Sequence, residues 1–329
     1  MRKIIVLFTI LVTFATPACR KSGEGKTFTI AVVPKGTTQE FWKSVHAGAI
    51  KAAEEYAARG IKVDLNWKGP IREDDREQQI QVIEGFLSQN VNGIVLAPLD
   101  NRALVRPVEE AERANLPTVI IDSGLESKKI VSFVATDNYK GGQLAAERLG
   151  NILHGKGNVL LLRYQEGSNS TELREKGFVD KLKSDYPQIE LISSDQHAGP
   201  TRDTAKRASE NLLQRFANDV QGIFTPNESS TIGMLLALED INKDGKIAFV
   251  GFDSTQQLID AINNRKLDGF VIQNPVNIGY LGVKTMVDHL LGSQVEKVID
   301  TGVMIVTPEN INTPQVQELI KPPLERYLK

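Results

Sequence analysis

The sequence has 329 residues, of which 41% are hydrophobic and 24% are charged, so it is typical of a globular chain and not of a disordered one. This length exceeds the roughly 250–300 residues at which a single hydrophobic core stops growing, which predicts two domains. The 39 basic residues nearly balance the 41 acidic ones, and a net charge of −2 excludes a chain-wide basic surface for nucleic acid. A single cysteine excludes an intrachain disulfide, a four-cysteine zinc site and an iron–sulfur ligand set.

The N-terminal residues are typical of an export segment. Two basic residues precede the nearly continuous apolar run Ile4–Ala15, which is shorter than the about 20 residues that span a bilayer. A small residue and then Cys19 follow, so the segment resembles a bacterial lipoprotein signal. We therefore expect residues 1–18 to be a lipoprotein-type signal peptide, Cys19 to be lipidated, and residues 19–26 to form a tether. A plain secretory peptide with an incidental cysteine is the alternative, and both versions predict a periplasmic or cell-surface location.

From residue 27 onward, short apolar runs rich in β-branched residues alternate with longer amphipathic stretches. The apolar runs predict strands at residues 28–33, 61–67, 93–97, 118–121, 131–135, 158–162, 189–193, 222–225, 247–252, 269–272 and 303–306. The amphipathic stretches predict helices at residues 41–58, 76–89, 103–114, 141–153, 173–183, 204–216, 231–241, 256–263 and 276–291. Four prolines exclude long helices from the tail, residues 307–329.

This rhythm of strands and helices predicts an α/β fold. Strands that are apolar on both faces and separated by helices form parallel sheets covered on both sides. The series divides most naturally between Ala135 and Asp137, after about five strands. We therefore expect two doubly wound, Rossmann-like lobes, each built on a parallel sheet.

Polar and aromatic side chains follow several of the predicted strands. Ligands of open parallel sheets bind beyond the carboxyl ends of the strands, so we take these positions as the candidate site: Gln39, Phe41, Trp42, Asp122, Ser123, Arg174, Asn227, Asp253 and Gln273. Carboxylates, amides and a guanidinium can bind neighbouring hydroxyl groups, and flat rings can cover the C–H faces of a sugar. The set therefore favours a carbohydrate ligand.

Each of these residues also has an interpretation without a ligand. Asp253, which precedes Ser254 and Thr255, could cap the next helix. Phe41 and Trp42 could be ordinary core residues, and Arg174, which stands among charged residues, could lie on a solvated surface.

The order of the motifs resembles that of the ribose-binding type of periplasmic sugar-binding proteins, which serve ATP-binding-cassette (ABC) importers. The resemblance covers residues 27–306 and is carried by these motifs: Phe41-Trp42, Ile121-Asp122, Ala135-Thr136-Asp137-Asn138 with Gly141-Gly142, Arg174-Glu175-Lys176-Gly177-Phe178, Asn227-Glu228, Val250-Gly251-Phe252-Asp253, and Gln273 ahead of Ile278-Gly279. It implies that Phe41 and Trp42 enclose a sugar ring. It further implies that the hydroxyls and ring oxygen are bound by Asp122, Arg174, Asn227, Asp253 and Gln273.

The resemblance also implies two lobes joined by a three-segment hinge, with the ligand in the cleft between them. It places residues 27–136 and 274–302 in an N-terminal lobe and residues 137–273 and 303–329 in a C-terminal lobe. Sugar binding would close these lobes without chemistry.

Three departures from the ribose-binding pattern put ribose itself in doubt. Ser123 stands where ribose binders carry an arginine, and Gly199-Pro200-Thr201 stands where they carry an aromatic residue. Gln39 replaces an asparagine and is one methylene longer. These changes predict the loss of a charged clamp and of a stacking wall, and therefore a different monosaccharide or a polyol as ligand.

We therefore expect a monomeric solute-binding protein that delivers a sugar or polyol to an ABC permease, tethered to a membrane through Cys19. A sensory sugar or autoinducer binder that docks on a chemoreceptor or sensor kinase is the alternative. We expect no enzyme activity, cofactor, metal or nucleic-acid partner, because no metal-binding spacing, nucleophile elbow, dinucleotide fingerprint or phosphate loop occurs. A repressor-type regulator is not expected either, since an export segment precedes the first strand.

Overall fold

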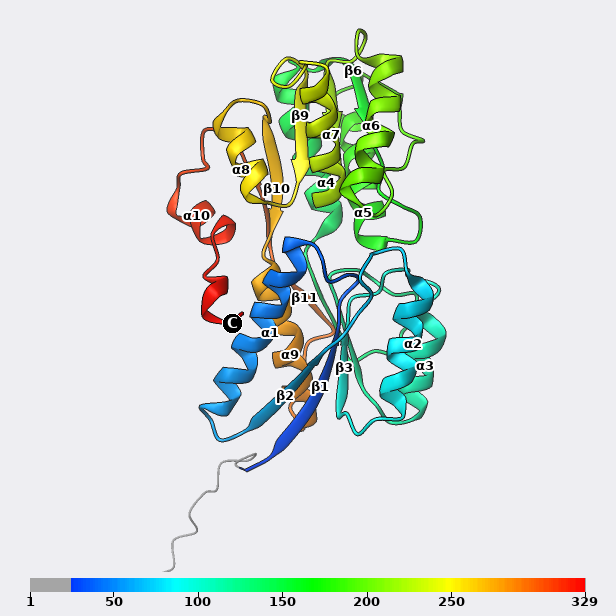
Figure 1. The fold of residues 1–329 in the computed structure, drawn as a ribbon, viewed down its shortest axis with the longest axis vertical. Coiled ribbons are helices and arrows are strands. Elements are labelled where there is room, and N and C mark those ends of the chain that lie inside the picture. Colours follow the sequence, from blue (N-terminus) through cyan, green and yellow to red (C-terminus); the bar gives the residue numbers. More distant parts are fainter. Residues whose placement is uncertain (1–24, 329) are drawn as a thin grey trace, which may run out of the picture.

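The computed structural model describes residues 25–328, which form two lobes, each built on a six-stranded sheet (Figure 1). The sheet of the N-terminal lobe has the strand order β11 (Val298–Asp300), β5 (Ser132–Ala135), β4 (Thr118–Ile121), β3 (Gly93–Leu96), β1 (Thr27–Val33) and β2 (Lys62–Trp67). The sheet of the C-terminal lobe has the order β12 (Val303–Val306), β10 (Gly269–Gln273), β9 (Ala248–Phe252), β8 (Gly222–Phe224), β6 (Lys156–Leu161) and β7 (Gln188–Ser193).

Helices cover both faces of each sheet. In the N-terminal lobe these are α1 (Glu40–Ala57), α2 (Arg76–Leu87), α3 (Val105–Arg113) and α9 (Pro275–Leu290). The C-terminal lobe has α4 (Asn138–Ile152), α5 (Asn169–Asp185), α6 (Arg202–Phe216), α7 (Glu228–Asp240), α8 (Gln256–Asn263) and α10 (Pro314–Ile320), followed by a short 3₁₀ turn at Leu324–Arg326. Among residues 25–328, no helix is both long and apolar enough to cross a membrane.

The alternation of side chains along β1 explains why its sheet needs helices on both sides. Ile30 and Val32 pack in the core cluster beneath α1 and α9, whereas Ala31 and Val33 pack in the cluster beneath α2 and α3. Successive side chains of a strand point to opposite faces, so a strand that is apolar throughout requires two buried faces. The predicted α/β fold class is therefore confirmed.

Two details of the sheets were not predicted. The strand β12 pairs antiparallel to β10, whereas the other strand pairs in the described residues are parallel. The short strand β11 was missed, because it has only three residues and exposed Val298 gives no buried apolar pattern.

The chain passes between the two sheets after β5, after β10 and between β11 and β12. The residue boundaries that we predicted for the lobes stay a prediction.

Glycines allow one pair of helices in each lobe to approach closely. A Cβ atom at Gly142 of α4 would lie 1.9 Å from the carbonyl oxygen of Arg174 in α5, and one at Gly177 would lie 2.0 Å from that of Tyr139. In the other lobe, Gly48 of α1 and Gly279 of α9 make the matching approach, with corresponding distances of 1.9 Å. The contact between α4 and α5 positions the backbone of Arg174, one of the predicted site residues.

We expect Gly142→Ala to destabilise the protein, because the new methyl group would force α4 and α5 apart. Overpacking of this kind costs about 1–3 kcal/mol of unfolding free energy, measured here by urea denaturation. The matched control is Gly85→Ala in α2, where a Cβ atom would meet no atom within 4 Å. That change should stabilise the helix by about 0.5–1 kcal/mol. If both substitutions changed the unfolding free energy equally, the close approach of α4 and α5 at Gly142 would be contradicted.

Candidate functional site

The candidate site is a cavity between the lobes, at the carboxyl ends of strands from both sheets. It is lined by Lys35, Gln39, Phe41, Trp42, Glu73, Asp122, Tyr164, Ser168, Ser170, Thr171, Arg174, Asn227, Glu228, Asp253 and Gln273. Eight of the nine predicted ligand-binding residues are in this set, and Ser123 is not. Their role in binding stays a prediction, but the structure brings them together from six segments of the chain.

A second, larger cleft of about 660 Å³ lies near the hinge and the C-terminal segment, with Tyr280, Gly302 and Pro322 in its lining. The buried carboxylates and the buried guanidinium converge in the smaller cavity at the strand ends instead. Ligand specificity in proteins comes from a few such convergent polar groups. We therefore take the strand-end cavity as the candidate site.

The two strand-end aspartates adopt the same unusual backbone conformation. Asp122 follows β4 with a φ of 62°, and Asp253 follows β9 with a φ of 67°. An L-residue in this left-handed region costs about 1–2 kcal/mol, and such residues cluster at functional sites. Both side chains are buried at the cleft, so each sheet presents a carboxylate to the same cavity.

The interactions of Asp253 exclude its alternative role as the cap of α8. Thr255 caps that helix and accepts a hydrogen bond from the backbone nitrogen of Leu258. The carboxylate of Asp253 accepts hydrogen bonds from Gln273 Nε2 at 2.7 Å and from the backbone nitrogen of Glu228 at 3.2 Å. Burial raises the pKa of Asp253, and the nearby charge of Arg174 opposes that rise.

Arg174 is a buried residue, so its surface interpretation is wrong. Its side chain donates to Asn138 Oδ1 at 2.8 Å and to the carbonyl oxygen of Pro226 at 2.9 Å. The guanidinium also lies 3.9 Å from the ring centroid of Phe252. Burial lowers the pKa of Arg174, while the aspartates around the cavity oppose that effect. Arg174 is thus held rigidly at the cavity by groups of its own lobe.

The predicted aromatic pair belongs both to the core and to the cavity. Trp42 is only 2% exposed and packs in the hydrophobic cluster beneath α1 and α9. Phe41 is partly buried and meets the Trp42 ring edge-on, with 5.0 Å between the ring centroids. Both side chains line the cavity as well. The core interpretation and the binding interpretation are therefore compatible.

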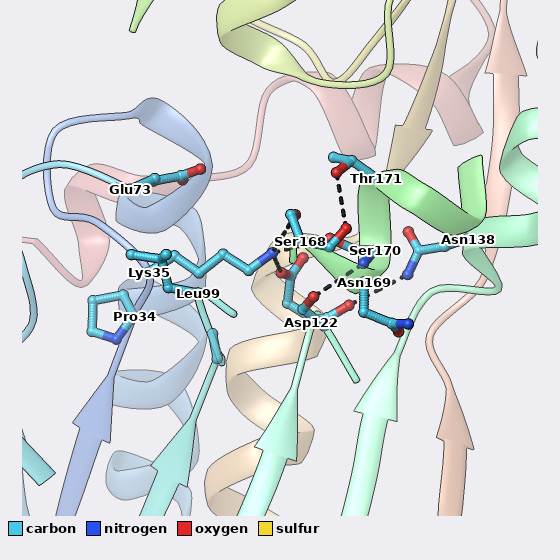
Figure 2. Close-up of polar contacts among 12 residues, drawn as sticks. Pro34, Lys35, Glu73, Leu99, Asp122, Asn138, Ser168, Asn169, Ser170 and Thr171 are labelled. Atoms are coloured by element: carbon cyan, nitrogen blue, oxygen red, sulfur yellow. Dashed lines mark hydrogen bonds and ion pairs between the residues drawn. The ribbon is translucent and has the colours of Figure 1, made fainter. Parts of the chain in front are cut away.

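Lys35 is the most informative residue that the sequence analysis missed. It follows β1 and forms a buried ion pair with Asp122 Oδ2, 2.9 Å long (Figure 2). Its ammonium also donates to Ser170 Oγ of the other lobe at 3.0 Å. The rule that located Asp122 also applies to Lys35, because both residues stand at the end of a strand. Lys35 therefore places a cation beside Asp122 although position 123 is a serine, and the predicted loss of a charged clamp stays a prediction.

The other missed residues come from loops and from the first turns of α5 and α7. Tyr164 follows β6 and is 1% exposed, so the C-terminal lobe has an aromatic side chain at the cavity despite Gly199-Pro200-Thr201. The predicted loss of a stacking wall stays a prediction, because it concerns the contact with a ligand. Glu73 lies in the loop before α2, and no sequence pattern indicated its burial. The remaining missed lining residues are Ser168, Ser170, Thr171 and Glu228.

Direct hydrogen bonds join the lobes around the cavity. Ser123 Oγ accepts from the backbone nitrogen of Ser170 at 3.0 Å, so this residue connects the lobes although it does not line the cavity. The backbone nitrogen of Phe41 donates to Glu228 Oε2 at 3.3 Å. Within residues 25–328, no cluster of three or more histidine, cysteine, aspartate or glutamate side chains is arranged to hold a metal ion.

Comparison with known proteins gives consistent similarities over most of the chain. Residues 30–294 match the model of the periplasmic binding protein domain. The chain is 30% identical to the ribose import binding protein RbsB of Bacillus subtilis over 318 residues, which cover 93% of this chain and 99% of the relative.

Two solved structures extend these similarities. A carbohydrate transporter solute binding protein from Agrobacterium radiobacter, in complex with D-arabinose, has a TM-score of 0.85 and 31% identity, with 90% of this chain and 99% of that chain covered. An ABC transporter solute binding protein from Agrobacterium vitis, with bound D-fucose, has a TM-score of 0.84 and 32% identity, with 89% and 100% covered.

Glu228 should make the stability of the protein depend on pH. Burial raises its pKa from 4.5 to about 7, although Arg202 Nη2 lies 2.8 Å from its carboxylate and opposes the shift. Between about pH 4.5 and 7 the folded state therefore binds more protons at this group than the unfolded state does. The contribution of Glu228 to the unfolding free energy then falls as the pH rises through this window, by up to about 3 kcal/mol at 1.4 kcal/mol per pKa unit.

The measurement is urea denaturation of the wild type and of Glu228→Gln at pH 5, 6, 7 and 8. Since other buried carboxyl groups titrate too, the quantity that matters is the difference between the two proteins. We expect the variant to gain stability relative to the wild type as the pH rises from 5 to 8. A constant difference across this range would contradict the raised pKa.

Proposed function

The chain belongs to the periplasmic binding protein family, and we propose that it is an extracytoplasmic solute-binding protein that captures a monosaccharide or polyol between its lobes and delivers it to an ABC permease. The similarity to RbsB and the family match confirm the resemblance that the motifs predicted. This is a family of binding proteins, so the prediction that the chain is not an enzyme is also confirmed.

The observation that carries the proposal is the convergence of the buried side chains of Asp253, Arg174 and Gln273 on one cavity. Gln273 lines this cavity and is 2% exposed, and its Oε1 is buried without a hydrogen-bond partner in the described part of the chain. Leaving a buried acceptor unpaired costs about 1–3 kcal/mol. A ligand hydroxyl can donate to this oxygen while neighbouring carboxylate and guanidinium groups bind its other hydroxyls.

The relatives support a sugar as the chemical class of the ligand. Ribose appears in the name of the Bacillus protein, and the two Agrobacterium proteins hold D-arabinose and D-fucose. Aromatic rings from both lobes, Trp42 and Tyr164, fit this class because they can lie against the C–H faces of a sugar ring. The cation beside Asp122 comes from Lys35 and not from position 123, which supports a ligand other than ribose.

The mechanism is reversible closure of the two lobes. A ligand that contacts both lobes binds the closed state more tightly than the open state. Binding therefore shifts the equilibrium toward the closed state. The closed face would then be recognised by the membrane permease.

The family places the protein outside the cytoplasm, and we propose that the lipid on Cys19 tethers it to a membrane. Cys19 and the signal segment lie outside the described residues.

A thermal-shift screen over pentoses, hexoses and polyols should identify the ligand. A compound present at 100 times its dissociation constant stabilises the folded state by about 2.7 kcal/mol and raises the melting temperature by several degrees. Amino acids and dicarboxylates serve as a control panel of similar size. If a control compound shifted the melting temperature while every sugar and polyol left it unchanged, the proposed ligand class would be wrong.

Asp253→Ala should weaken binding of the compound that the screen identifies. The change leaves Gln273 Nε2 and ligand hydroxyls without their acceptor in a dry cavity, at a cost of about 2–5 kcal/mol, or at least about 30-fold in the dissociation constant. Isothermal titration calorimetry measures this change. Asp260→Ala, on the exposed face of α8 in the same lobe, is the matched control and should bind normally. Equal affinity of the Asp253 variant and the wild type would refute the site.

A further inference from the structure

Glu73 is a buried carboxylate that connects the two aromatic walls of the cavity. The residue lies in the loop between β2 and α2 and is 7% exposed. Its Oε1 accepts a hydrogen bond from Trp42 Nε1 at 2.5 Å, and its Oε2 accepts one from the hydroxyl of Tyr164, also at 2.5 Å. Both oxygens therefore accept hydrogen bonds from aromatic side chains that line the cavity.

The two partners of Glu73 come from opposite lobes. Trp42 belongs to α1 of the N-terminal lobe, whereas Tyr164 follows β6 of the C-terminal lobe. The main chain of Glu73 is bound to the C-terminal lobe too, since its carbonyl oxygen accepts from Gln165 Nε2 at 2.8 Å. The hydrogen bonds to Tyr164 and Gln165 can exist only while the lobes are closed.

The surroundings of Glu73 are shaped to hold it in this place. A Cβ atom at Gly36 would lie 2.9 Å from Glu73 Cγ, so a larger residue at position 36 would displace the side chain. Burial raises the pKa of Glu73, while the charge of Lys35 and the two hydrogen bonds oppose that rise. A buried carboxylate is tolerated only where such donors and charges compensate it.

We propose that Glu73 is a positioning residue for ligand binding, which fixes the separation of the Trp42 and Tyr164 rings and couples it to lobe closure. One carboxylate oxygen orients the indole within its own lobe, and the other holds the phenol of the opposite lobe. The slot between the rings thus reaches its final width only when the lobes close. This inference rests on the proposed function, because the slot serves to enclose a sugar ring.

The first experiment observes the Trp42 indole, without ligand for Glu73→Gln and with the ligand from the screen bound for Tyr164→Phe. The chain has two tryptophans, Trp42 and Trp67, so the indole N–H region of a ¹⁵N-correlated NMR spectrum holds two signals. The ring of Trp67 stacks on His46, with 4.2 Å between the centroids, and its signal serves as the internal reference. Glu73→Gln should shift the Trp42 signal and leave that of Trp67 in place. In the ligand-bound, closed protein, Tyr164→Phe removes only a hydroxyl on the other lobe and should also shift Trp42, because Glu73 connects the two rings.

The second experiment measures binding of the sugar or polyol found in the screen. Glu73→Gln and Tyr164→Phe should each raise the dissociation constant about tenfold, mainly through faster dissociation. The double variant should be no weaker than the weaker single variant, since both changes break the same connection. Glu110→Gln, the same chemical change at a half-buried position of α3 outside the cavity lining, is the control and should bind normally.

The results separate this inference from the proposed function. Unchanged Trp42 signals in both variants, or effects on affinity that multiply in the double variant, would overturn the role of Glu73. If Glu73→Gln failed to fold, Tyr164→Phe would still decide the question, because it keeps the ring and the carboxylate. A wild-type chain that bound no sugar or polyol would refute the proposed function, while the ligand-free NMR spectrum of Glu73→Gln would still decide whether Glu73 binds the Trp42 indole.

Discussion

The structure depends on one geometric constraint, the meeting of two mostly parallel sheets at the carboxyl ends of their parallel strands (Figure 1). The residues after β1 and β4 of one lobe face, across a single cavity, those after β6, β8 and β9 of the other lobe and Gln273 at the end of its β10. Each loop at these ends carries a polar or aromatic side chain to the same place. The helices and the two hydrophobic cores fix the positions of the strands. The ends of these strands in turn determine where the cavity lies.

Placing many charges in a dry cavity requires that each be compensated. Lys35 neutralises Asp122, Arg202 pairs with Glu228, and the charges of Arg174 and Asp253 lower each other's cost of burial. Each of these charge pairs lies within one lobe, but two of their members also form hydrogen bonds to the other lobe. Lys35 donates to Ser170 Oγ (Figure 2), and Glu228 accepts from the backbone nitrogen of Phe41. The closed arrangement of the lobes is therefore stabilised by the same polar groups that a ligand would contact. Ligand specificity and lobe closure thus depend on the same residues.

Strand-end positions were predictable because the periodicity of the sequence reveals where strands end. Asp122, Asp253 and Gln273 each follow an apolar run directly, and all three line the cavity. Lys35 could have been found by the same reasoning. Glu73 could not have been found in this way, because it lies in a loop that contacts the other lobe. Its charged neighbours in the sequence also predict an exposed carboxylate. Ser123 was predicted to line the cavity because it follows Asp122, but it does not. Its hydroxyl instead accepts a hydrogen bond from the backbone nitrogen of Ser170.

By itself the sequence determined the α/β fold class, the two-lobe division and most of the residues at the cavity, because these follow from local periodicity and from positions along the chain. Only the tertiary structure decided which cation accompanies Asp122, where the second aromatic wall comes from and which carboxylate connects the lobes. These features depend on pairs such as Glu73 and Tyr164, which are 91 residues apart in the chain. A contact over that separation leaves no periodic signal, and it forms only when two independently packed sheets come together.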